Sequence, residues 1–318
     1  AKRATATLPC TTGCQGANLS GANLTGASAI GTDFTGANFT GANLSMADFD
    51  GANLTSANLA LTTISSWVTS PTTIFTNVSS GGMTGTPNSV WSGLFLVSGY
   101  LVGPGVNLSG ANLKYSDLTC GAGSTGCISM AGTNLAGANF TGADIVGVSF
   151  AGAANMSNVN LSHQSLAGQN LSGLNLSGAN LSYANLCGPT NLSNANLTGA
   201  NLQLIAGQAI DSNCSAGMTA ANWYKANLTN ANVTSANLGG GINFTGANMT
   251  GTNFTSSNLQ SANLSSLILK NTNFTNTYMA GTTVTNDAFA GAHVTFLGSQ
   301  GWPPKTTSGN TWDSTLIC

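Results

Sequence analysis

The sequence predicts an all-β solenoid built from many short strands, and three observations lead to this fold class. A bulky apolar residue recurs at every fifth position, and a small residue, mostly Ala, stands two positions before it. Only 4% of the 318 residues are charged. Residues two apart point to the same side of a strand, whereas a period of five fits neither a helix nor a flat strand. The chain must therefore turn a corner after each short strand.

The repeating unit first reads Ala17-Asn18-Leu19-Ser20-Gly21, and we call its bulky central residue i. We count 43 such units in seven blocks, with centres at 19–64, 108–118, 130–150, 156–186, 192–202, 223–238 and 244–294. Ala at i−2 and Leu or Phe at i would fill a narrow interior, while Gly at i+2 would turn the corner. We expect the central residues to be buried and the preceding asparagines to face outward, as in the pairs Leu19 and Asn18, Phe39 and Asn38, Leu176 and Asn175, Phe254 and Asn253, and Phe274 and Asn273.

Three polar residues fall on interior positions of the repeat. Gln164, Gln169 and Asp287 all stand at i−2, where Ala is usual. A buried amide needs hydrogen-bond partners, so we expect the two glutamines to bond to the backbone of strands or corners. This predicts a structural role for them.

The tandem A-(N/D)-L-x-x pattern resembles the pentapeptide-repeat family across all seven blocks. The resemblance implies a right-handed, four-sided parallel β-helix with four units per coil, and hence about 10–11 coils. Such a solenoid has one continuous core and counts as one domain. We expect an N-terminal arm or cap at 1–16, the β-helix at 17–294 and a C-terminal tail at 295–318.

Three segments depart from the repeat inside the β-helix, at 65–105, 119–127 and 203–221. They either fold back and cover exposed coil edges, as solenoids require, or form an interaction surface with aromatic anchors. The sequence leaves both interpretations open. The candidate interface residues are Trp67, Trp91, Phe95, Tyr100, Trp302 and Trp312.

Catalytic and metal-binding patterns are absent from the sequence. The two histidines, His163 and His293, have no Cys or Asp at metal-ligand spacing, and glutamate does not occur. The triplet Gly239–Gly241 has no following Lys to meet a phosphate. With six Lys+Arg there is no basic patch for nucleic acid, and no apolar run reaches the length of a membrane helix. We expect no enzyme activity, no cofactor and no metal.

The cysteines and the first residue favour a secreted chain. Most cysteines lie in the excursions and termini, where disulfides would fasten loops in an oxidising compartment. The chain starts at Ala1 without Met or an apolar leader, as a processed secreted chain would. Local pairing predicts Cys120–Cys127 and Cys187–Cys214. That leaves Cys10, Cys14 and Cys318, of which one is free or bonded to another chain. We expect the tail 295–318 to dock on the next subunit, with Cys318 cross-linked or close to that subunit's Cys10 or Cys14.

The outward face carries 23 Asn-x-Ser/Thr sequons. The repeat generates them automatically, so their number alone does not indicate glycosylation. The near-absence of charge does favour it, because an uncharged rod without sugars should self-associate. The candidate glycosylation sites are Asn18, Asn23, Asn38, Asn43, Asn53, Asn107, Asn139, Asn170, Asn175, Asn180, Asn196, Asn243, Asn248, Asn253 and Asn273.

The function that these features favour is structural. We expect a self-associating, secreted, glycosylated β-solenoid that assembles head to tail into an extracellular fibre or surface layer, with itself as partner. One alternative is a monomeric ice-binding or carbohydrate-binding module that uses the flat columns Thr245, Ser265, Thr285 and Thr255, Thr275, Thr295. The other is the topoisomerase-interacting DNA mimic known in the family, which needs a more acidic rod than eight Asp provide.

Overall fold

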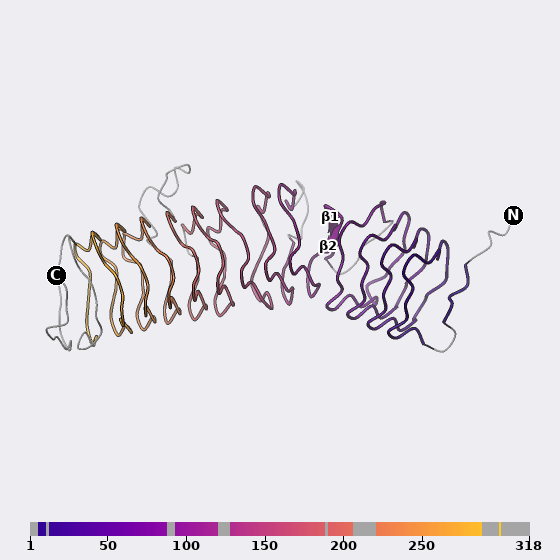
Figure 1. Cartoon of the computed structure of the whole chain (residues 1–318), viewed down its shortest axis with the longest axis horizontal. Coiled ribbons are helices and arrows are strands. Elements are labelled where there is room, and N and C mark those ends of the chain that lie inside the picture. Colours follow the sequence, from indigo (N-terminus) through magenta and orange to yellow (C-terminus); the bar gives the residue numbers. More distant parts are fainter. Residues whose placement is uncertain are drawn as a thin grey trace.

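The described coils stack into a long rod, with the first coils at one end and the last coils at the other (Figure 1). The computed structural model describes residues 6–10, 13–87, 93–119, 128–187, 190–205, 221–287 and Ser299. Parallel bridges join residues one coil apart and define four sides. Side A starts with Asn18↔Asn38, side B with Asn23↔Asn43, side C with Ser28↔Asp48 and side D with Asp33↔Asn53. Each coil therefore holds four units of five residues.

Backbone hydrogen bonds between coils hold each side together. The N–H of residue i donates to the next coil, as Leu19 does to the Asn38 carbonyl at 2.7 Å. The N–H of residue i−1 donates to the previous coil, as Asn38 does to the Ala17 carbonyl at 2.9 Å. A third bond closes each corner, from the Ala22 N–H to the Leu19 carbonyl at 3.1 Å. A short strand that lies between two coils is thus satisfied by the coil on either side, and one core runs through the rod.

The interior confirms the predicted alternation of small and large residues. Phe39, Leu176 and Phe254 are fully buried, while Leu19 and Phe274 are nearly so. The interior glutamines also behave as predicted. The Gln164 Nε2 donates to the Phe140 carbonyl at 2.8 Å, and the Gln169 Nε2 donates to the Val148 carbonyl at 2.7 Å. Their amides therefore complete the backbone bonding of the adjacent coil.

The expected excursion 65–105 is wrong in its first half, because the coil continues to Thr84. Val68, Ile74, Ser79 and Thr84 bridge to Asp48, Asn53, Asn58 and Thr63 of the coil below. In three of these four units the order of sizes is inverted, while the unit at Ile74 keeps the usual order with Phe75 at position i. The large residues Trp67, Val78 and Met83 take the i−2 position, and the small residues Thr69, Ser80 and Gly85 take position i. An extra residue between Val68 and Ile74 also shifts the spacing, and together these changes hide the repeat.

The second half of the segment 65–105 contains two strands that pair with each other. Strand β1 (Phe95–Val97) pairs antiparallel with β2 (Tyr100–Val102), and the turn Ser98–Gly99 has positive φ at both residues. Such a two-residue turn matches the twist of a hairpin. The hairpin folds back on the preceding coil, since the Met83 N–H donates to the Gly99 carbonyl at 3.0 Å. Of the two interpretations of this segment, the structure shows the first, because the hairpin covers part of the preceding coil.

Candidate functional site

Three kinds of feature in the described residues would bear on function: metal-binding clusters, membrane-spanning helices and pockets. No group of three His, Cys or Asp side chains is placed to hold a metal there. No helix in that part of the chain is long and apolar enough to cross a membrane. A pocket of about 260 Å³ lies where the hairpin leaves the rod, and its lining includes Ile74, Phe75, Leu94 and Pro104 but no titratable group.

The N-terminal edge is open on three of the four sides. The amides and carbonyls of Asn18, Asn23 and Ser28 have no backbone partner in the described part of the chain. On side D the Asp33 carbonyl accepts a bond from the Cys14 N–H at 3.1 Å. Three short strand edges thus present unpaired donors and acceptors at this end.

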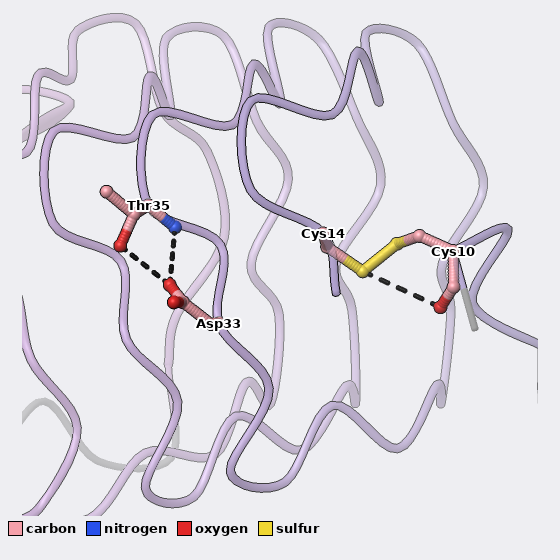
Figure 2. Close-up of a disulfide and its surroundings, with 4 residues drawn as sticks. All are labelled: Cys10, Cys14, Asp33 and Thr35. Carbon is pink, nitrogen blue, oxygen red and sulfur yellow. Dashed lines mark hydrogen bonds between the residues drawn. A yellow bond between two sulfur atoms is a disulfide. The ribbon is translucent and has the colours of Figure 1, made fainter. Parts of the chain in front are cut away.

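A disulfide fastens the arm that precedes the first coil. Cys10 and Cys14 are bonded, and Cys14 is fully buried as the first core residue (Figure 2). Ala6 and Leu8 of the arm are partly buried and pack against the core. This pairing excludes the expected bond from Cys318 to Cys10 or Cys14 of a neighbour, which is therefore wrong. Cys187 is also disulfide-bonded, but Cys120, Cys127, Cys214 and Cys318 lie outside the described residues, so the Cys187–Cys214 and Cys120–Cys127 pairings stay predictions.

Beside the disulfide, the unit at Asp33 shows the turn that recurs along the rod (Figure 2). The Thr35 N–H and hydroxyl both donate to Asp33 Oδ1, at 2.9 and 2.6 Å. The hydroxyl bond, together with the bonds from Gln15 and the Thr35 N–H, lowers the pKa of the Asp33 carboxyl below its usual value. Asn takes the same position in most units, where it accepts the N–H bond and, in several of them, the hydroxyl bond as well, without a charge.

The outward asparagines form hydrogen-bonded ladders along sides A and B. On side A the Asn175 Nδ2 donates to Asn155 Oδ1 at 3.1 Å, and the Asn196 Nδ2 donates to Asn175 Oδ1 at 3.2 Å. In several sequons the Ser or Thr hydroxyl donates to the same oxygen, as Thr198 does to Asn196 Oδ1 at 2.7 Å. The Asn-x-Ser/Thr pattern thus has a structural use. Among the candidate glycosylation sites, the exposed ones are Asn18, Asn23 and Asn170.

The Ser and Thr columns considered for ice or carbohydrate binding are engaged within the rod. The hydroxyls of Thr245, Thr255 and Thr275 donate to the asparagine two residues before each of them, at 2.6 to 2.7 Å. The Thr285 hydroxyl donates to Ser265 Oγ at 2.8 Å, and Thr295 lies outside the described residues. Hydroxyl hydrogens already bonded in this way are not offered to an outside ligand.

One corner of the rod carries a row of aromatic side chains that the sequence analysis did not single out. The corner after side B holds Tyr115, Gly142, His163, Tyr183 and Leu204 in successive coils, each three residues after a bridged asparagine. The rings of His163 and Tyr183 stack with centroids 4.6 Å apart and planes 5° apart. The sequence feature that could have revealed this row is a bulky residue at i+2, where Gly is usual. His163 was noted at this position, but only as a metal-ligand candidate to be dismissed.

The candidate interface residues separate into different environments. Trp67 is wrong as a surface anchor, because it is fully buried and packs edge-on against Phe49 and Phe75, with ring centroids 5.5 and 6.0 Å away. Phe95 on the hairpin is 40% exposed, and the Tyr100 hydroxyl accepts a bond from the Asn112 N–H at 3.2 Å. The remaining candidates, Trp91, Trp302 and Trp312, lie outside the described residues, as do His293, the 119–127 loop beyond Thr119, most of 203–221 and the tail except Ser299.

Comparison with protein families identifies the repeat. The family model described as "Pentapeptide repeats" matches eight copies, over residues 17–59, 128–153, 154–188 and 240–276. The chain therefore carries pentapeptide repeats, and the predicted resemblance to that family is confirmed. The predicted fold class, a right-handed four-sided β-helix, is thereby confirmed. Members of this family are typically structural or interaction proteins without catalysis.

Several solved pentapeptide-repeat structures are similar to this chain. HetL, a protein involved in heterocyst differentiation regulation from the cyanobacterium Nostoc sp. strain PCC 7120, is 23% identical, with 82% of this chain and 89% of that chain covered and a TM-score of 0.21. QnrB1, a plasmid-mediated fluoroquinolone resistance protein, is 13% identical, with 90% and 92% covered and a TM-score of 0.26. At such TM-scores these likenesses carry no functional argument. Among curated proteins, none matches the sequence.

Proposed function

We propose that this protein is a structural subunit that stacks end to end through the N-terminal edge of its first coil. The observation that carries this proposal is the unpaired backbone at Asn18, Asn23 and Ser28. Unpaired strand edges are templates for pairing with another chain. A second rod that placed its last coil about 4.8 Å away would continue the ladder on these three sides.

End-to-end contact between identical rods is heterologous, so it propagates as a filament unless it closes into a ring. The rod opposes such contact very little, because six Lys+Arg and eight acidic residues leave a net charge of −2 over 318 residues. Proteins with little net charge lack the repulsion that keeps neighbours apart. The proposed assembly is therefore an extended fibre or a layer of such fibres.

The disulfides support a location outside the cell, as part of the same proposal. Cys10–Cys14 and the bonded Cys187 need an oxidising compartment to persist. In that compartment the exposed sequons at Asn18, Asn23 and Asn170 are the first candidates for sugars. Glycans on the rod would be seen as an intact mass above the 31.7 kDa of the bare chain.

Proline at the open edge tests the assembly. Asn23→Pro with Ser28→Pro removes two N–H groups that have no backbone partner within the rod, and it blocks pairing with another strand. Asn23→Ala with Ser28→Ala is the matched control. Negative-stain microscopy and light scattering should show filaments for the wild type and the Ala control, and single rods with an unchanged melting temperature for the Pro variant.

Two results would reject the proposal. Wild-type protein that stays as single rods at high concentration would exclude end-to-end assembly, and a Pro variant that polymerises like the wild type would exclude this edge. Deletion of 295–318 tests the separate prediction that the tail docks on the next subunit. A truncated chain that still forms fibres would remove the tail from the assembly and leave the edge as its only basis.

A further inference from the structure

The aromatic strip, which we define as Tyr115, His163 and Tyr183, is built into one corner over four successive coils. With about 4.8 Å per coil, its rings extend over roughly 14 Å along the rod axis. Tyr115 is 73% exposed and Tyr183 is 45% exposed. The coil between Tyr115 and His163 has Gly142 at the corner. A Cβ at that position would lie 2.5 Å from Tyr115 Cδ1, so the glycine leaves the space that the ring occupies.

The backbone at these positions is strained, and bulky residues in this conformation are more frequent at this corner than at the other three. Tyr115, His163, Tyr183 and Leu204 have φ between 57° and 62°, in the left-handed region where side chains other than Gly, Asn and Asp are disfavoured. At the other corners the positive-φ residues of the repeat are mostly Gly, Asn and Ser. Bulky residues held in strained conformations cluster at functional sites. Here the strain holds ring side chains outward in a row.

The surroundings of the aromatic strip are polar, with single charges of both signs. Lys114 lies on the side before the strip, with its Nζ 4.8 Å from the Tyr115 ring centroid. Asp117, Asp144 and Ser165 lie on the side after it and are exposed. Ring faces beside separate hydroxyl, carboxylate and ammonium groups are suited to a ligand that has an apolar face and many hydroxyls. The two carboxylates disfavour an anionic ligand.

We propose that the aromatic strip binds a neutral polysaccharide chain that runs along the rod axis, with pyranose rings stacked on the tyrosines. A second copy of this rod is a poorer occupant. The strip is a convex corner with one side chain per coil, and two rigid corners touch along a line. Such a contact would bury far less than the roughly 800 Å² per partner that a stable protein interface needs. A thin, flexible glycan meets no such limit.

Affinity electrophoresis in gels that contain hydroxyethylcellulose or galactomannan tests this site, with alginate gels as the anionic comparison. The strip variant is Tyr115→Gly with Tyr183→Gly, because Gly suits the left-handed backbone and should leave the fold intact. The matched control is Leu61→Gly with Ser256→Gly, which makes the same backbone change at other corner positions. A second variant, Tyr115→Phe with Tyr183→Phe, keeps the rings.

We expect a neutral gel to retard the wild type, the Leu61/Ser256 control and the Phe variant to a similar degree. The strip variant should lose at least tenfold in affinity, while its melting temperature stays the same or rises. Four outcomes would overturn the proposal. These are no retardation of the wild type in either neutral gel, retardation in alginate alone, full retention of binding by the strip variant, or a strip variant that loses self-association without any loss of glycan binding.

Discussion

Two neighbouring regions of the rod build the same coil from different sequences. In residues 17–64 the bulky residue stands at position i, and Asn or Asp stands at i−1 in most units, where its Oδ1 accepts a bond from the N–H two residues on. In residues 65–85 the bulky residue moves to i−2 in three of the four units, while Phe75 keeps position i in the other one, and the i−1 residues are Val68, Ile74, Ser79 and Thr84. Both regions nevertheless keep the parallel bridges between coils.

The difference shows which parts of the repeat the backbone requires. The fold needs a large and a small side chain on the inner face of each short strand, in either order, because both point into the same interior. It does not need the asparagine turn, although that turn adds bonds to the coil. The region 65–85 has a substitute, since the hairpin folds back onto it and the Leu101 N–H donates to Ser80 Oγ at 2.9 Å.

The inverted order should matter most at Trp67. Replacing a buried Trp by Ala leaves a large cavity, so Trp67→Ala should lower the free energy of unfolding by about 3–5 kcal/mol. Adding Thr69→Phe to Trp67→Ala restores the order of Ala47 and Phe49 in the coil below. Chemical denaturation of the single and double variants should show that the second change recovers more than half of the loss. If the double variant is less stable than the single one, the two orders are not equivalent.

Trp67→Phe is the matched control for this test. The Trp67 Nε1 is buried and has no hydrogen-bond partner within the described residues, so Phe removes an unsatisfied donor together with some volume. We expect a loss below about 1.5 kcal/mol.

The same i−2 position holds a carboxyl in the last described coil. Asp287 is 1% exposed, and its burial raises the pKa from 3.8 to about 7, although its Oδ1 accepts a bond from the Leu267 N–H. Because the folded state binds this proton more tightly, the stabilisation is complete below pH 3.8 and is lost as the pH rises through about 7. Each unit of pKa difference corresponds to about 1.4 kcal/mol.

Melting curves between pH 4 and pH 8 test this interpretation of Asp287. The Asp287→Asn variant keeps an oxygen for the Leu267 N–H and cannot ionise, so its melting temperature should change less with pH than that of the wild type. Parallel curves for the two proteins would show that Asp287 does not titrate in this range.

The first core position offers the next largest effect, at the opposite end of the rod. Cys10→Ala with Cys14→Ala removes a bond that closes a short loop, which is worth about 2 kcal/mol in the chain-entropy description. The loss should be confined to the arm and the first coil, where Ala6 and Leu8 pack against the core. Hydrogen exchange should therefore rise at residues 6–24 and stay unchanged beyond residue 40. A uniform rise along the whole rod would contradict this local effect.

The regular units could be predicted from the sequence because each of their positions repeats the same physical choice. Leu19, Phe39 and Phe254 are buried where the period places them. The coil at 65–85 was missed because a search for bulky residues at position i does not find Trp67, Val78 or Met83 at i−2. The pairing of Cys10 with Cys14 was left open, since spacing alone does not choose among three cysteines.

The candidate site was harder to predict than the fold. The sequence shows Tyr115 and Tyr183 at the corner position, but only the stacking of coils places them beside His163 on one edge. Likewise, the repeat shows that Asn precedes each central residue, but the ladders appear only when one coil lies on the next. Which residues lie above one another in successive coils depends on the number of residues in each coil. Insertions such as the one before Ile74 change that number.

The smallest expected effect is a gain, and it tests whether the asparagine turn is an addition to the coil or a condition for it. Ser79 lies in the side A column next to Asn58 and Asn107. Ser79→Asn would supply an Oδ1 for the Gly81 N–H, as Asn58 does for the Ala60 N–H at 3.0 Å. By analogy with helix caps we expect a gain of roughly 0.5–1 kcal/mol, and a loss of similar size for Asn58→Ser. Urea denaturation of the two variants measures both changes. Equal and opposite shifts would show that the turn adds the same increment in either region. A gain in stability at residue 79 without a loss at residue 58 would mean that other hydrogen bonds in the regular coils compensate for a lost asparagine turn, and that the inverted coil has no such compensation.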